Sequence, residues 1–247
     1  MADYGNFDLE QVRIAAEKNI DAVKNNFSKP FRFSSVDPSK FQHLCLRFYE
    51  KCEYRLLGLG FSVIGNVEDI SMRKQRPDPK TFIRIMVDND CTTTAAIYHI
   101  KPNAFWSALL YLSGFFHRKI YEFESEFTDG SFITTTILSE SKSQIPNANI
   151  FSFHYPHKTP IIDLYKLHKR HFQQHIKQVP SREPIQQKTI EDIQLSLNRQ
   201  IALKNEHFLN NGSLTLEQLQ KRTNNKLFAE KVYEEIKNIL CSEAVKG

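Results

Sequence analysis

The sequence lacks most of the motifs by which enzymes and membrane proteins are recognised. Only 8 of its 247 residues are glycine, and no P-loop, G-x-S-x-G or strand-following G-x-G-x-x-G pattern occurs, so the common nucleotide-binding and hydrolase motifs are excluded. No apolar run approaches the roughly 20 residues that span a bilayer. The N-terminus has no basic stretch followed by an apolar one, so we expect no secretory signal and a cytoplasmic protein.

Cysteine is also scarce, and its placement argues against a disulfide framework or a zinc site. Of the four cysteines, Cys45 and Cys52 lie about two helical turns apart, roughly 10 Å, too far for a disulfide. No C-x-x-C is present, and Cys91 near His99 is more simply explained as incidental than as a nucleophile with its base. These absences favour a protein without enzymatic activity.

The clearest structural signal is a β-hairpin over residues 119–138. Asp129-Gly130 predicts a two-residue type I′ turn that pairs Phe127 with Phe132 and Glu126 with Ile133. Side chains alternate along a strand, so the hairpin has two sets of side chains on opposite faces. The face with the glutamates is expected to be solvated, because glutamate is seldom buried without a partner. The core set is Tyr121, Phe123, Phe127, Phe132 and Leu138; the solvated set is Glu122, Glu124 and Glu126 beside Ile133, Thr135 and Ile137.

The remaining periodicity predicts an α+β protein, with an antiparallel sheet of about six strands covered by helices. Strands are expected at residues 61–70, 81–87, 92–100 and 150–155 besides the hairpin, and helices at 8–26, 40–57, 104–116, 161–177, 185–209 and 215–240. The short turns between strands favour antiparallel pairing. We predict three parts: an N-terminal amphipathic helix (1–30), an α+β core (31–178) and a C-terminal helical hairpin (179–247).

The chain has a formal net charge of +5, and one stretch, residues 166–188, accounts for all of it. This stretch holds six basic side chains and one acidic residue, Glu183. Such a concentration suits an anionic partner: an acidic protein, a phosphate-bearing ligand or an anionic membrane surface. The residues expected to bind it, on the basic helix 164–178 and the following linker, are Lys166, Lys169, Arg170, Lys177 and Arg182. The alternative is a solvated helix, or one paired with Glu122, Glu124 and Glu126.

The same helix carries histidines in the pattern H-x-x-H-x-x-x-H. His168 and His171, at i and i+3, could chelate one metal ion, and His154 and His157 lie upstream; His175 is two turns from His168. This is the second hypothesis, an enzyme of unrecognised family with a His-rich site that binds zinc or supplies a general base. Chance clustering of the nine histidines is the simpler interpretation.

Several short segments resemble a pattern found in uncharacterised bacterial α+β proteins. They are G-L-G-F-x-x-I-G at residues 58–65, E-F-T-D-G-S at 126–131, T-T-T at 134–136 and L-Y-K-L-H at 164–168. The resemblance covers about residues 40–175 and implies a bacterial origin and a shared module, without transferring an activity. The acidic C-terminus resembles the tail signals of type IV secreted effectors, which implies secretion as an alternative to a cytoplasmic location.

Other partners follow from the helices. Residues 213–236 resemble the start of a helix-turn-helix, but Glu230, Glu234 and Glu235 would repel phosphate, so sequence-specific DNA binding is not expected. The apolar segment 104–116 or the basic helix could contact a membrane surface peripherally. The helical ends could mediate a homodimer. The leading hypothesis remains a non-enzymatic interaction module with an acidic partner.

Overall fold

The structure is a computed structural model that describes residues 8–27, 30–71, 81–100, 118–137, 149–211, 216–223 and 225–244. It divides into two compact units. The sheet unit contains residues 31–140 and 148–198, and the helical unit contains residues 1–30, 141–147 and 199–247. The predicted helix 104–116 lies outside the described residues, and the predicted three-part division of the chain stays a prediction.

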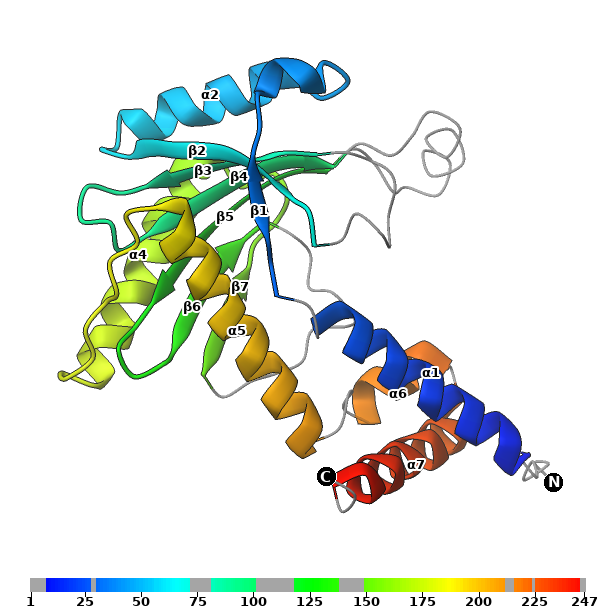
Figure 1. The fold of residues 1–247 in the computed structure, drawn as a ribbon. Helices are drawn as coiled ribbons and strands as arrows, with labels where there is room; N and C mark the ends of the chain where they lie inside the picture. Colours follow the sequence, from blue (N-terminus) through cyan, green and yellow to red (C-terminus); the bar gives the residue numbers. More distant parts are fainter. Residues whose placement is uncertain are drawn as a thin grey trace. The chain divides into compact units, whose positions relative to one another are not determined.

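The sheet unit confirms the α+β class and corrects the number of strands. Its described residues form a seven-stranded sheet in sequential order, antiparallel throughout except for the parallel pair β6–β7 (Figure 1). The strands are β1 (Phe33–Ser35), β2 (Ser62–Asp69), β3 (Ile83–Val87), β4 (Thr94–Ile100), β5 (Arg118–Glu126), β6 (Phe132–Thr136) and β7 (Ile150–His154). The prediction missed β1, whose three residues pair with the end of β2 and are too few to show an alternating pattern.

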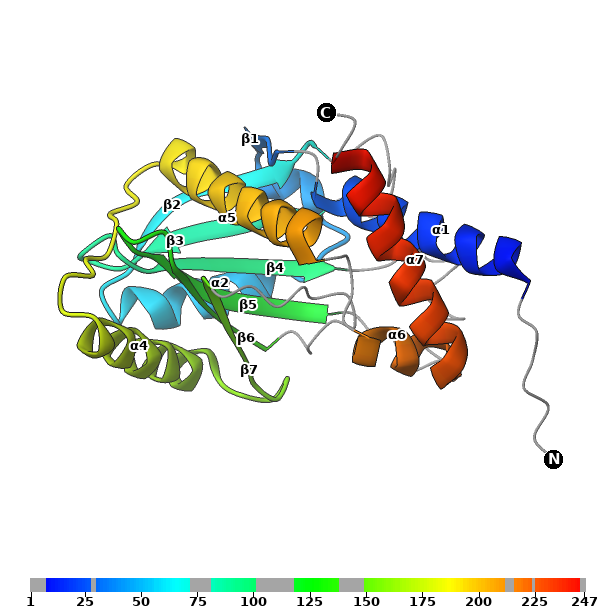
Figure 2. The ribbon, with the colours of Figure 1, turned by 90° about the horizontal axis from the view of Figure 1, so that it is seen from below.

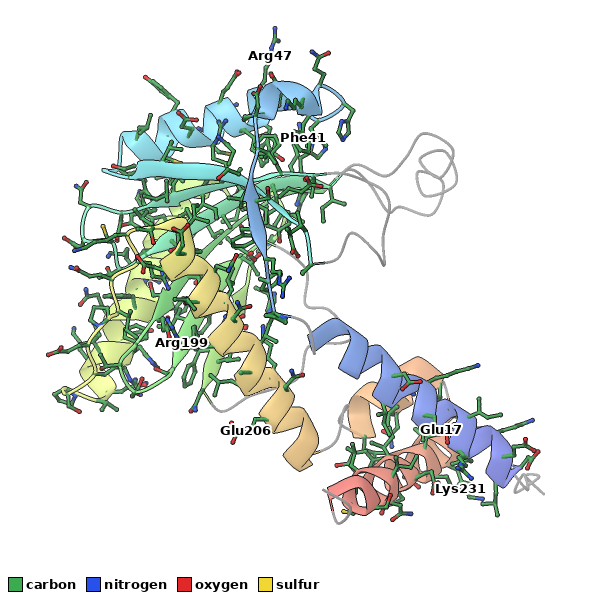
Figure 3. The ribbon with its side chains drawn as sticks, in the orientation of Figure 1. Glu17, Phe41, Arg47, Arg199, Glu206 and Lys231 are labelled. Atoms are coloured by element: carbon green, nitrogen blue, oxygen red, sulfur yellow. The ribbon has the colours of Figure 1, made fainter. Side chains whose placement is uncertain are left out.

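Helices cover both faces of this sheet. One face packs against η1 (Pro38–Phe41), α2 (Leu46–Leu57) and α4 (Ile161–Gln178). Phe41 lies in this core, with its ring centroid 5.2 Å from that of Phe82 (Figure 3). The opposite face packs against the first half of α5 (Ile190–Asn211), which Figure 2 shows in front of the strands with α2 behind them.

The start of α5 is later than the sequence predicted. The predicted helix began at Ile185, but α5 begins at Ile190, where the Thr189 hydroxyl accepts the Asp192 N–H and the Asp192 carboxylate accepts the Thr189 N–H. The preceding segment is extended along the sheet unit. Its Ile185 N–H donates to the Glu126 carbonyl and its Gln187 N–H to the Cys91 carbonyl, at 2.8 and 2.7 Å.

The hairpin is present, but its register differs by one residue from the prediction. Glu126 pairs with Phe132 and Ser125 with Ile133, around a three-residue turn, Thr128 to Gly130. Gly130 takes the left-handed conformation, with φ of 77°, that a bulged three-residue turn requires. Asp129 holds this turn by accepting the Ser131 N–H and hydroxyl at 3.0 and 2.6 Å.

The one-residue difference moves side chains to the opposite face, as the period of two requires. Phe132 lies on the side of the glutamates, whereas Ile133 and Thr135 lie on the side of α4. The expected solvated glutamate face is also wrong, because α5 and its preceding segment cover that side and Glu126 is only 2% exposed.

The helical unit is a separate cluster of α1 (Leu9–Phe27), α6 (Leu216–Thr223) and α7 (Lys226–Ala244). The N-terminal stripe of Val12, Ala16 and Ile20 packs with apolar residues of α6 and α7, so the N- and C-terminal helices were correctly expected. The single helix predicted at 215–240 is two helices, the second capped by the Asn225 side chain, which accepts the Phe228 N–H at 3.0 Å. None of the helices in the described part of the chain is both long and apolar enough to cross a membrane.

Candidate functional site

The inner side of α4 carries histidines that hydrogen-bond to hydroxyl groups of the sheet. His168 is fully buried, with Nε2 3.0 Å from the Ser125 hydroxyl and Nδ1 3.0 Å from the Thr135 hydroxyl. Burial, with a smaller contribution from the Lys169 charge, lowers the pKa of His168 to about 3. The ring is therefore neutral at physiological pH and ties α4 to β5 and β6.

The next two histidines make equivalent contacts farther along the helix. His171 stacks on Phe153 at a centroid distance of 3.6 Å and its Nε2 lies 2.7 Å from the Tyr155 hydroxyl. His175 lies 2.7 Å from the Ser131 hydroxyl. Desolvation lowers the pKa of both rings. The H-x-x-H-x-x-x-H spacing is thus the sheet-facing stripe of a packed helix.

The residues predicted as metal ligands do not form a metal site. His168 contacts hydroxyls on β5 and β6, whereas His171 contacts the Tyr155 hydroxyl just after β7. His154 ends β7 opposite Thr136, and His157 is exposed in the following turn. All four belong to the described residues, and those residues contain no group of three or more His, Cys, Asp or Glu side chains placed to hold a metal ion. The zinc hypothesis gains no support from this geometry.

Two of the five residues predicted to bind an anion are in ion pairs with residues far away in the sequence. Lys169 lies 3.3 Å from the buried Asp88, and its ammonium also lies over the Phe172 ring at 4.7 Å. Arg182 contacts the Asp129 carboxylate at 2.6 Å and donates to the His175 carbonyl at 2.8 Å. These cations stabilise loops of the sheet unit.

The other three predicted residues, Lys166, Arg170 and Lys177, are exposed on the outer side of α4. Their spacings of four and seven residues place them on one face, along about 16 Å of helix. We call this set the α4 stripe. Asp163, the one acidic residue in α4, lies 4.0 Å from Lys166 with both side chains mostly exposed, a pair that contributes little.

The predicted pairing of the basic helix with the glutamate row does not occur for Glu122 and Glu124. Ser125 and Thr135 point to α4 and contact His168. Glu122 and Glu124 lie on the other face, where they line a cavity with Ile193 of α5. The basic and acidic groups therefore lie on opposite sides of one sheet.

That cavity has a volume of about 230 Å³ and is mostly apolar; we call it the α5 cavity. Its floor is β3, β4 and β5, where Ala96 lies in register between Ile85 and Glu122. The small alanine in the middle of the sheet leaves room that larger neighbours do not fill. The α5 roof is fixed by Asn198 and Gln194, whose side chains accept the backbone N–H groups of Phe31 and Phe33 at 2.6 and 2.7 Å.

One end of the α5 cavity is polar. Gln187 is 3% exposed, and its Oε1 accepts the Thr94 hydroxyl at 2.5 Å. Its Nε2 is buried and has no hydrogen-bond partner among the described residues. Thr94 pairs across the strands with Glu124, so these groups lie together. Sequence reasoning missed this site, because only strand pairing brings Ala96 and the two glutamates to the same floor.

Comparisons of the chain with protein-family models, with curated proteins and with solved structures found no match. The resemblance to uncharacterised bacterial proteins therefore stays a prediction, and any function has to be argued from the residues themselves.

Proposed function

We propose that the protein is a non-enzymatic interaction module that binds an acidic protein partner through the α4 stripe. The observation that supports this most strongly is the sorting of charge on α4. Its inner side carries histidines, two of them buried and all with lowered pKa values, while Lys166, Arg170 and Lys177 face outward. Cations placed this way raise association rates and select partners of opposite charge.

The form of the stripe favours a protein over the other anionic partners. Its three cations are spread along about 16 Å of helix, as suits several carboxylates in a row more than a single phosphate group. Gln173 and Gln174 are exposed between Arg170 and Lys177. Membrane-surface helices need an outward apolar face to insert, whereas the apolar side of α4 is packed on the sheet.

The test is capture of acidic proteins from lysate by charge-reversed variants. The stripe variant is Lys166→Glu/Arg170→Glu/Lys177→Glu. A matched control, Lys40→Glu/Arg47→Glu/Lys51→Glu, changes the net charge equally at exposed positions on η1 and α2, where Figure 3 shows Arg47 pointing away from the sheet. We expect the stripe variant to lose its partners and the control to keep them, with capture weakened by salt.

Two results would contradict the proposal. One is unchanged capture by a folded stripe variant. The other is that no protein is captured, while the wild type sediments with phosphatidylserine vesicles, salt reverses this, and the stripe variant does not sediment. That result would assign the stripe to a membrane surface.

A further inference from the structure

The α5 cavity is large for a space inside a folded unit. Its volume of about 230 Å³ exceeds the roughly 150 Å³ of an apolar cavity that stays dry and binds benzene. Scaled from benzene, the space suits a molecule of about nine non-hydrogen atoms. Cavities destabilise the fold around them, because their walls lose packing contacts. This one is nevertheless maintained, since Gln194 and Asn198 of the roof accept the backbone N–H groups of Phe33 and Phe31.

The wall of the cavity is apolar along most of its length. Thr94 and Tyr98 lie on one face of β4, on either side of Ala96 and about 13 Å apart. Gln187 lies at the Thr94 end, because its Oε1 accepts the Thr94 hydroxyl. A molecule lying over Ala96 would therefore have apolar contacts on most of its surface. The large apolar side chains that supply them are Phe31, Phe33, Ile83, Ile85, Ile193 and Leu197.

The carboxylates in the wall do not call for a ligand of opposite charge. Glu122 and Glu124 line the cavity, but both already have interaction partners within the protein, and Glu124 also accepts the Thr134 hydroxyl at 3.4 Å. A cation would have to compete with these partners, and an anion would be repelled by the carboxylates. Either would also lose its hydration on entering a mainly apolar space, which is costly. The cavity therefore favours a neutral molecule.

The tyrosine in the wall is neutral as well. Burial, with a smaller contribution from the Glu122 carboxylate, raises the pKa of Tyr98 well above its usual value. Its ring adds to the aromatic lining provided by Phe31 and Phe33, whose rings are stacked with centroids 6.0 Å apart. Ring edges and faces of this kind pack well against a flat ring. The apolar body of the ligand is thus best supplied by an aromatic ring.

Gln187 indicates which polar group the ligand carries. Its side chain lines the cavity, the residue is only 3% exposed, and its Nε2 is buried with no hydrogen-bond partner among the described residues. A buried amide donor left unsatisfied is costly, and buried polar groups are nearly always paired. Because Oε1 already accepts the Thr94 hydroxyl, the group left to pair is a donor. The matching group on a ligand is an acceptor, such as a carbonyl oxygen.

From these observations we infer that the α5 cavity binds a small, neutral, mainly apolar molecule with one hydrogen-bond acceptor, of the kind represented by an aromatic ketone. Gln187 donates to the acceptor through Nε2, and the ring lies over Ala96 between the floor of the sheet and the α5 roof. The site is on the opposite face of the sheet from α4 and is independent of the α4 stripe.

Probes of matched size test this class of ligand in the full-length protein. Acetophenone has a ring and a carbonyl acceptor, and α-methylstyrene has the same shape without the acceptor. Benzoate and protonated α-methylbenzylamine carry a negative and a positive charge. Binding is followed by the methyl NMR signals of Ile85 and Ile193, which line the cavity. We expect both neutral probes to shift these signals saturably at or below millimolar concentration, and neither charged probe to do so.

Variants locate the binding and test the hydrogen bond. Gln187→Met removes the donor at similar size, so the ratio of acetophenone affinity to α-methylstyrene affinity should fall several-fold. The ratio cancels the difference in hydration between the two probes. Ala96→Val should weaken the binding of both probes, and Ala96→Leu should abolish it, because the added side chains fill the space. The stripe variant of α4 is the control and should bind both probes as the wild type does.

Several results would overturn the inference. Acetophenone would give no saturable shift if the cavity held only water. A charged probe that bound as well as acetophenone would contradict the neutral class, and folded Ala96 variants with wild-type affinity would place the binding elsewhere. An affinity ratio unchanged by Gln187→Met would refute the assigned hydrogen bond and, with it, the ligand class.

Discussion

His168 links the chemistry of a single side chain to the stability of the sheet unit. Both ring nitrogens are within hydrogen-bond distance of hydroxyls, on Ser125 and Thr135, and no part of the side chain reaches solvent. Because only the neutral ring fits this environment, the folded state binds a proton far less readily than the unfolded chain does.

This produces a defined dependence on pH. The pKa of His168 is about 3 in the folded state, against 6.5 for the unfolded group. Its contribution to stability is therefore complete above pH 6.5 and is lost progressively as the pH falls toward 3. Between pH 7 and 4.5 we expect the free energy of unfolding to fall by about 2 kcal/mol from this residue.

The pKa values of Asp37, Asp129 and Asp192 are also lowered, so these carboxylates contribute to the pH dependence of the unfolding free energy as well. Their contribution is lost only below about pH 4, which is below the window of pH 4.5–6.5. His171 and His175 add to the same slope. Urea unfolding of His168→Gln should show a clearly smaller loss in this window. An identical pH slope in wild type and variant would refute the account of His168.

At the scale of elements, the hairpin turn shows how one residue sets a register. Gly130 has φ of 77°, and a Cβ added there would meet no atom within 4 Å. Gly130→Ala should therefore destabilise the protein by about 1 kcal/mol through backbone strain alone. Gly58→Ala is the control, because Gly58 has φ of −64° and room for a Cβ. Equal unfolding free energies for the two variants in urea would contradict this explanation.

The elements that repeat a pattern locally were predictable from the sequence, and those set by distant partners were not. Asp-Gly suits either a two-residue turn or a bulged three-residue one. The choice is stabilised by Asp129, which caps Ser131 and pairs with Arg182, 53 residues further along the chain. β1 depends likewise on its pairing with β2, since three residues carry no period.

Contacts with residues distant in the sequence also limit what can be predicted of the candidate site. The sequence correctly predicts a helix at residues 161–177, but it cannot show that Lys169 is held by a partner in the fold while Lys166 stays exposed. The pairing of Lys169 with Asp88, 81 residues away, removes it from the free surface. The α5 cavity depends on strand register and on the placement of Gln187, and neither is encoded within a short window of sequence.

At the scale of the molecule, the sheet unit has its own core. The three apolar clusters around the sheet share no residue with the cluster of α1, α6 and α7. A fragment of residues 31–211 should thus fold alone, with one cooperative urea transition and native-like far-ultraviolet circular dichroism. A fragment that is unfolded in buffer would show that the sheet unit depends on the helical unit.

Charge is separated across the sheet unit. The cations of the α4 stripe lie on one side of the sheet, and Glu122 and Glu124 face the α5 cavity on the other.

The central claim, that the α4 stripe binds an acidic protein surface, is tested most directly by affinity for a defined acidic peptide. The measurement is the fluorescence anisotropy of a labelled glutamate-rich peptide titrated, at physiological ionic strength, with wild type, the stripe variant and the η1/α2 control variant. We predict at least tenfold weaker binding by the stripe variant and less than a twofold change for the control. Equal weakening in both variants would show that net charge, and not the stripe, attracts the peptide, and the claim would fail.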